Sequence, residues 1–115
     1  MAKSPPKPGK KVRSSESGRP IMALLDLLGR RWALRIIWEL REGPLRFRGL
    51  QEASGGLSPT LLNQRLRELR EADAVELTDK GYRLTKDGEE LFVVLAPLND
   101  WAEKWALRTS NNEVT

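Results

Sequence analysis

Four polar side chains recur at the spacing of one helix face in the middle of the chain: Thr60, Asn63, Gln64 and Arg67. Residues three and four apart lie on the same side of an α-helix. Asparagine and glutamine can pair with both hydrogen-bonding groups at an adenine edge, and arginine with those at a guanine edge. The four residues are therefore candidates to lie close to the bases of double-stranded DNA, although a merely solvated helix face can have the same composition.

The helix that would carry these side chains is marked by an apolar stripe and by its first residues. Leu62, Leu66 and Leu69 recur on the opposite side, which predicts a helix over 58–72. Ser58 is a favourable N-cap, and the proline after it fits the first helical turn. Because a helix start presents backbone N–H groups to an anion, Ser58 is also a candidate phosphate contact.

The residue types exclude several kinds of chemistry. The 115-residue chain has no cysteine and no histidine, so it cannot form a disulfide, a zinc-finger site or a Ser-His-Asp triad. It also lacks a glycine-rich phosphate-binding loop. We therefore expect one small domain that is not an enzyme and needs no metal or cofactor. No apolar run approaches the roughly 20 residues of a membrane span, and no apolar core of a secretory signal is present, so we expect a cytoplasmic protein.

Basic residues are concentrated at the N-terminus. Residues 1–20 carry six basic groups and one acidic group, whereas residues 21–115 carry 14 basic and 15 acidic groups. A segment rich in lysine, proline, serine and glycine is expected to be disordered, so residues 1–19 are predicted to form a basic tail. Such a tail could strengthen DNA binding by counterion release, or it could only keep the protein soluble.

Periodicity and helix-breaking residues predict the other elements. Before the helix at 58–72 we expect helices at 20–28, 30–42 and 47–53, a short extended segment at 45–47 and a turn at 54–56. After it we expect strands at 75–78 and 82–85 in a tight hairpin, then a helix that Thr85 caps and Pro97 breaks. This order predicts a mainly α fold with a small β-hairpin, a winged helix-turn-helix over residues 20–108, and a frayed tail over 109–115.

Further basic residues are candidates for contacts with DNA phosphates. Arg46 and Arg48 lie at the start of the helix at 47–53, and Lys80 and Arg83 lie on the hairpin. The alternative is that these charges only keep the surface soluble. Arg65 lies at the edge of the apolar stripe, and we expect it to form a structural ion pair rather than a DNA contact.

Two pairs of tryptophans call for different interpretations. Trp101 and Trp105 follow the break at Pro97 with i, i+4 spacing. In so small a domain they have little left to pack on, so we favour a contact with a partner subunit over a place in the domain's own core. Trp32 and Trp38 are expected to be interior residues rather than a ligand site.

Four motifs resemble a known family of bacterial regulators. Residues 28–37 resemble the "IGGKWxxxIL" opening of HxlR-type transcriptional regulators, and residues 43–50 are similar to their "GPxRFxEL". Residues 57–69 resemble the family's "ISxxxLxxRLxEL", and residues 82–88 its "YxLTxxG". The four motifs stand in the family's order and at its spacing, between about Pro20 and about Trp105.

The resemblance implies a homodimeric DNA-binding regulator, more often a repressor, that reads a pseudo-palindromic operator. The helix at 58–72 would enter the major groove, and the hairpin would flank it. The first and last helices would form the dimer interface, for which the candidates are Ile21, Leu24, Leu25, Leu98, Trp101 and Trp105.

The chain departs from the family at two points. Many members carry a Cys-Pro pair before the first helix and use the thiol as a sensor, but here the pair is Arg19-Pro20. If the protein responds to a small-molecule effector, that effector must therefore act without a thiol, and its site would lie between the dimer helices and the DNA-reading helices. The hairpin is also shorter than the usual wing.

The nearly neutral balance of residues 21–115 leaves an alternative function open. In that alternative, the winged helix binds another protein and has no sequence-specific contact with DNA.

Overall fold

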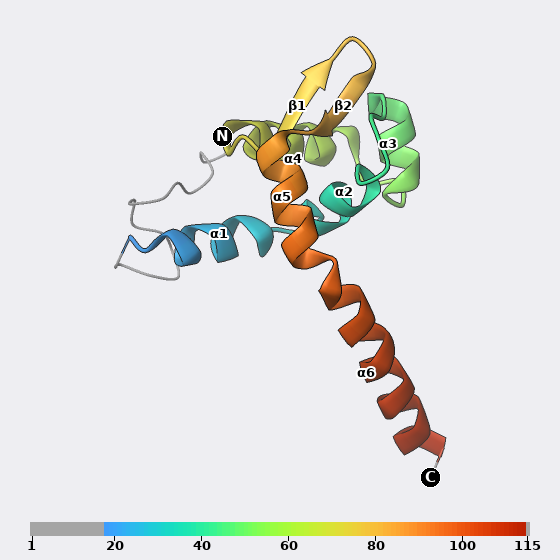
Figure 1. Cartoon of the computed structure of the whole chain (residues 1–115). Coiled ribbons are helices and arrows are strands. Elements are labelled where there is room, and N and C mark those ends of the chain that lie inside the picture. The colour runs from blue at the N-terminus through green and yellow to red at the C-terminus, as the bar shows by residue number, and fades with distance from the viewer. Residues whose placement is uncertain (1–17, 115) are drawn as a thin grey trace.

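The computed structural model describes residues 18–114. Its elements in chain order are α1 (Pro20–Leu28), α2 (Ala33–Glu39), α3 (Phe47–Ala53), α4 (Pro59–Glu71), β1 (Val75–Thr78), β2 (Gly81–Leu84), α5 (Lys86–Leu95) and α6 (Pro97–Val114). Figure 1 shows α1 to α5 and the hairpin gathered into one body, from which α6 extends outward. The predicted mainly α fold with a small hairpin is confirmed. The predicted basic tail lies outside the described residues, apart from its last two.

The core lies between the first five helices and the hairpin. The predicted apolar stripe of α4, formed by Leu62, Leu66 and Leu69, is fully buried. It packs with buried leucines and isoleucines of α1, α2 and α3 and with apolar residues of both strands. Burying each such side chain contributes about 1.5–3 kcal/mol, so this packing fixes the orientation of α4.

The helix α2 is shorter than predicted, and the turn before it is longer. The sequence predicted a helix over 30–42, whereas α2 spans only Ala33–Glu39. The residue before it, Trp32, has a φ of 75°, a left-handed conformation that is costly for a residue other than glycine. Its indole packs over Gly55 in the turn between α3 and α4. This tertiary contact, which the local pattern does not contain, explains why the helix begins later.

The hairpin is tight and is tied to the segment before α3. Thr78 pairs with Gly81, so Asp79 and Lys80 form a two-residue turn. The predicted extended segment is a single bridge in which Leu45 exchanges two backbone hydrogen bonds with Tyr82, at 2.9 and 2.8 Å. Gly81 has a φ of 118°, and a Cβ there would lie 2.5 Å from the Leu45 carbonyl oxygen. The close approach therefore requires a glycine.

The two C-terminal helices are separated where the sequence predicted a break. The Thr85 hydroxyl oxygen caps α5 by accepting a hydrogen bond from the Gly88 N–H at 3.0 Å, and α6 begins at Pro97. However, α6 continues to Val114, beyond Thr109, where the sequence predicted a frayed tail. The Thr109 hydroxyl group bonds back to the carbonyl oxygens of Trp105 and Ala106 and so stays within the helical pattern.

Candidate nucleic-acid interface

The exposed face of α4 is a single polar stripe. Thr60, Asn63 and Arg67 are exposed, and Gln64 beside them is half-buried. The N-terminus of the helix is fixed by the Ser58 side chain, whose Oγ accepts a hydrogen bond from the Leu61 N–H at 3.1 Å. The structure therefore brings the four predicted base-proximal side chains together on one face of α4.

Arg70 belongs to the same stripe and was missed by the sequence reasoning. It lies three residues after Arg67 and is exposed near the end of α4. The signal that could have found it is the spacing i, i+4, i+7 of Asn63, Arg67 and Arg70, which places the three on the same helix face. A cation near the C-terminus of a helix is also favourable for the helix dipole.

A buried ion-pair network holds the other side of α4. Glu68 is 2% exposed, and its carboxylate accepts hydrogen bonds from Arg30 Nη1 at 2.7 Å and Arg65 Nη1 at 3.1 Å. Arg65 Nε also donates to the Arg31 carbonyl oxygen at 2.7 Å. The expected structural role of Arg65 is thus confirmed. The network joins α4 to the turn after α1 and so limits rotation of the polar stripe.

The predicted phosphate contacts have different environments. Arg46 Nη2 donates to the Asp79 carbonyl oxygen at 3.1 Å, which ties the start of α3 to the hairpin turn next to Lys80. Arg48 is exposed and has no hydrogen bond or ion pair with residues 18–114. Arg83 pairs with Glu76 across the hairpin at 2.7 Å, so its charge is largely compensated. Arg46, Arg48 and Lys80 therefore supply the uncompensated positive charge of this group.

Exposed apolar side chains lie on α1 and on α6. Five of the six residues predicted for a dimer interface are at least half exposed, namely Ile21, Leu25, Leu98, Trp101 and Trp105. The sixth, Leu24, is half-buried. The two tryptophan rings stack with centroids 5.9 Å apart.

Some exposed apolar residues were not recognised in the sequence as surface residues. Val93 and Val94 near the end of α5 and Leu107 on α6 are all exposed, Val94 the most at 74%. Figure 1 shows α6 running away from the body, which agrees with the exposure of Leu107 in its second half.

No group of three acidic, histidine or cysteine residues within 18–114 is arranged to hold a metal ion. In the same range, no helix is both long and apolar enough to cross a membrane.

The fold and the exposed helix face define a winged helix-turn-helix of the DNA-binding type. Residues 27–110 match the family described as HxlR-like helix-turn-helix. The chain therefore belongs to the HxlR-like helix-turn-helix family, as the motifs predicted, and it is a transcriptional regulator rather than an enzyme.

Relatives in Bacillus subtilis support this assignment. The HTH-type transcriptional regulator YodB is 35% identical over 87 residues, which cover 70% of this chain and 78% of YodB. The uncharacterized HTH-type transcriptional regulator YvaP is 32% identical over 88 residues, covering 70% of this chain and 82% of YvaP. The crystal structure of quinone-bound YodB is similar to this fold with a TM-score of 0.68 at 34% identity, over 73% of this chain and 96% of that one.

Proposed function

We propose that the protein acts as a homodimer that represses transcription by binding a pseudo-palindromic operator with α4 in the major groove. The observation that carries this proposal is the exposed stripe of Thr60, Asn63 and Arg67 on a helix whose opposite face is locked into the core. The short side chains of Thr60 and Asn63 let a rigid helix approach base edges closely, and the longer side chain of Arg67 can reach a guanine edge. Two such helices related by a two-fold axis read two half-sites one DNA turn apart, about 34–36 Å.

The basic residues around this face complete the proposed contact. Arg48 and Lys80 are exposed and unpaired within the described chain, and they flank α4 from α3 and from the hairpin turn. They would contact phosphates on either side of the groove and set the register of α4, while the bases are read by α4 itself. Arg83, paired with Glu76, would contribute less.

The exposed apolar residues of α1 and α6 support the dimer. Stacked tryptophans and neighbouring leucines in contact with water are unfavourable, and such patches mark contacts between proteins. In an isologous interface the same surface serves both subunits. The α1 patch (Ile21 and Leu25) and the α6 patch (Leu98, Trp101 and Trp105) would then be covered together when two copies associate.

In this proposal, the dimer represses transcription because of its size and its position at the promoter. A dimer that covers two half-sites at a promoter excludes other proteins from the same DNA face. The described residues form one DNA-binding fold with a single additional helix, which is sufficient for such exclusion.

The proposal is tested by selecting a preferred operator from random DNA and measuring affinity by mobility shift over a series of salt concentrations. Arg67→Ala should reduce discrimination at one base pair of each half-site by about 1–3 kcal/mol. Arg41→Ala, which removes an arginine that stacks on Trp38, should leave the preference unchanged. A protein for which no preferred sequence can be selected, with binding that disappears when residues 1–19 are removed, would instead be the protein-binding module that the sequence left open.

A further inference from the structure

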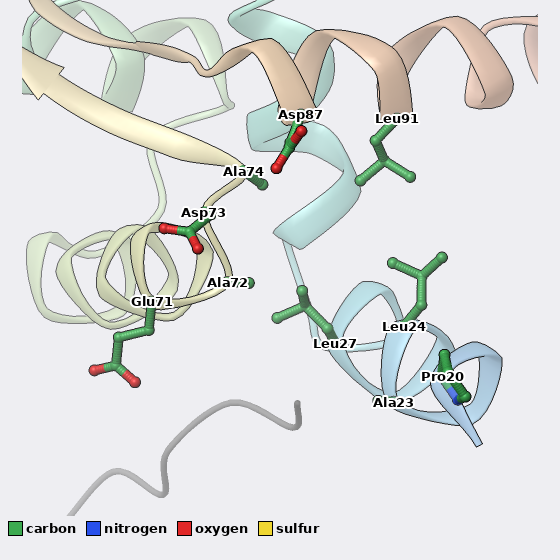
Figure 2. Close-up of a pocket in the computed structure, with 10 residues that line it drawn as sticks. All are labelled: Pro20, Ala23, Leu24, Leu27, Glu71, Ala72, Asp73, Ala74, Asp87 and Leu91. Atoms are coloured by element: carbon green, nitrogen blue, oxygen red, sulfur yellow. The ribbon is translucent and has the colours of Figure 1, made fainter. Parts of the chain in front are cut away.

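A cavity of about 470 Å³ lies where α1, the end of α4 and the start of α5 meet (Figure 2). Its apolar wall is formed by Ala23, Leu24 and Leu27 of α1 and by Leu91 of α5. Figure 2 shows Leu24 and Leu91 reaching toward each other from the two helices. Ala23 and Leu27 are 3% and 5% exposed, so the floor of the cavity is part of the core. Small-molecule sites typically have volumes of about 300–1,000 Å³ and mostly apolar walls.

Within residues 18–114, the charged residues that line this cavity are all acidic. They are Glu71 and Asp73 at the end of α4 and Asp87 in the first turn of α5. Residues 21–115 carry nearly equal numbers of basic and acidic groups, 14 and 15, so composition alone does not favour an entirely acidic rim. None of the three carboxylates forms a hydrogen bond or an ion pair with another described residue.

The three carboxylates are not equivalent. Figure 2 shows the Asp87 carboxylate pointing toward Ala74, while the Glu71 carboxylate points away from α1 and α5. Asp87 lies one helical turn before Leu91 on α5, so of the three carboxylates it is the one that shares a helix face with the apolar wall. Asp73 and Glu71 add negative potential at the outer rim.

We propose that this cavity binds a small organic cation with an apolar body, of the quaternary ammonium or phosphonium class. The apolar body would displace water from Leu24, Leu27 and Leu91, and this burial is the main source of affinity. The positive charge would lie toward Asp87, where an opposite charge at short range is favourable. An anion of the same shape is disfavoured because every charged group at the rim is negative.

The place of the cavity gives the site a regulatory consequence, which rests on the proposed function. It touches α1, a helix of the proposed dimer contact, and the end of α4, the proposed DNA-reading helix. A molecule held between them would favour one relative placement of the two helices. Binding of the cation is measured without DNA. A protein that does not bind the cation could therefore still bind an operator, and the two proposals are tested independently.

The test is calorimetric titration of the full chain with tetraphenylphosphonium in the absence of DNA. We expect one saturable site per subunit. Asp87→Asn should weaken binding by about twofold to fivefold, because an exposed ion pair contributes at most about 1 kcal/mol. Combining it with Glu71→Gln and Asp73→Asn should weaken binding at least about tenfold. Asparagine suits the left-handed conformation of residue 73, which has a φ of 61°.

Two controls keep the result interpretable. Glu90→Gln removes an exposed carboxylate of α5 that does not line the cavity, and it should leave affinity unchanged. Thermal unfolding of each variant should match that of the parent protein, which shows that lost binding is not lost folding.

Three results would overturn the proposal. The first is no saturable binding at millimolar concentration. The second is equal binding by the parent and the triple carboxylate variant, with loss on Trp101→Ala, which would place the cation on the α6 tryptophans. The third is binding only by dissociated subunits in sedimentation experiments, which would mean that a second copy of the chain fills the cavity.

Discussion

The buried carboxylate of Glu68 provides the sharpest test of how α4 is held. In Glu68→Gln the side chain keeps its shape, but Arg30 and Arg65 lose the negative charge that they share. Glu68 is 2% exposed, while the side chains of Arg30 and Arg65 are 17% and 13% exposed. Removing one partner of a fully buried ion pair costs about 3–5 kcal/mol. Both arginines retain some contact with water, Arg30 keeps its ion pair with Asp26 at 3.3 Å, and glutamine can still accept a hydrogen bond. We therefore expect a loss of about 2–4 kcal/mol in the free energy of unfolding.

The hairpin offers a matched control for this substitution. Glu76 contacts Arg83 at 2.7 Å, the same distance as between Glu68 and Arg30, but the Glu76 and Arg83 side chains are 43% and 53% exposed. Glu76→Gln should therefore cost no more than about 1 kcal/mol. The assay is urea unfolding followed by circular dichroism, at one protein concentration because dimerisation would contribute to stability. Equal and small losses for the two variants would refute the argument that burial of the network fixes α4.

Further substitutions test the packing and the proposed dimer. Gly88→Ala should lower the free energy of unfolding by several kcal/mol, because its new Cβ would overlap the Ala74 carbonyl oxygen, a backbone atom that cannot move easily. Gly49→Ala places its Cβ in open space on α3 and should instead raise the free energy of unfolding by about 0.5–1 kcal/mol. Urea unfolding measures both changes in stability, and a loss of stability in Gly49→Ala would contradict the argument that Gly88, but not Gly49, lacks room for a side chain. The double substitution Trp101→Ala and Trp105→Ala should shift the protein toward monomer, with at least about a tenfold weaker association in analytical ultracentrifugation. An unchanged association constant would remove α6 from the proposed interface.

The elements that the sequence predicted well are those with local signals. Ser58 and the proline after it mark the start of α4, Thr85 caps α5, and a break at Pro97 separates α5 from α6, each as predicted. The bounds of α3 were also correct, because a proline and a pair of glycines delimit it. In these cases the cause lies within a few residues of its effect, so a pattern can reveal it.

The features that the sequence did not predict depend on contacts between distant residues. The left-handed Trp32 is explained by packing over Gly55, and Arg30 meets Glu68 across 38 positions of the chain. The cavity combines α1 with Asp87 and Leu91 of α5, which no periodicity connects. The exposed stripe of α4 was predictable as a helix face, but the role of its side chains depends on a DNA partner and remains the subject of the proposal.

The central claim is that a dimer presents two α4 helices at the spacing of one DNA turn. Because the chain has no native cysteine, Thr60→Cys gives one labelling position per subunit, at the exposed start of α4. Pulsed electron spin resonance on the nitroxide-labelled full chain then measures the distance between the two helices directly. We expect a distribution centred near 34–36 Å, broadened by the label linkers. Two results would contradict this geometry. One is the absence of any measurable distance between labels, and the other is a distribution centred below about 20 Å, which would place the two α4 helices against each other inside the dimer contact.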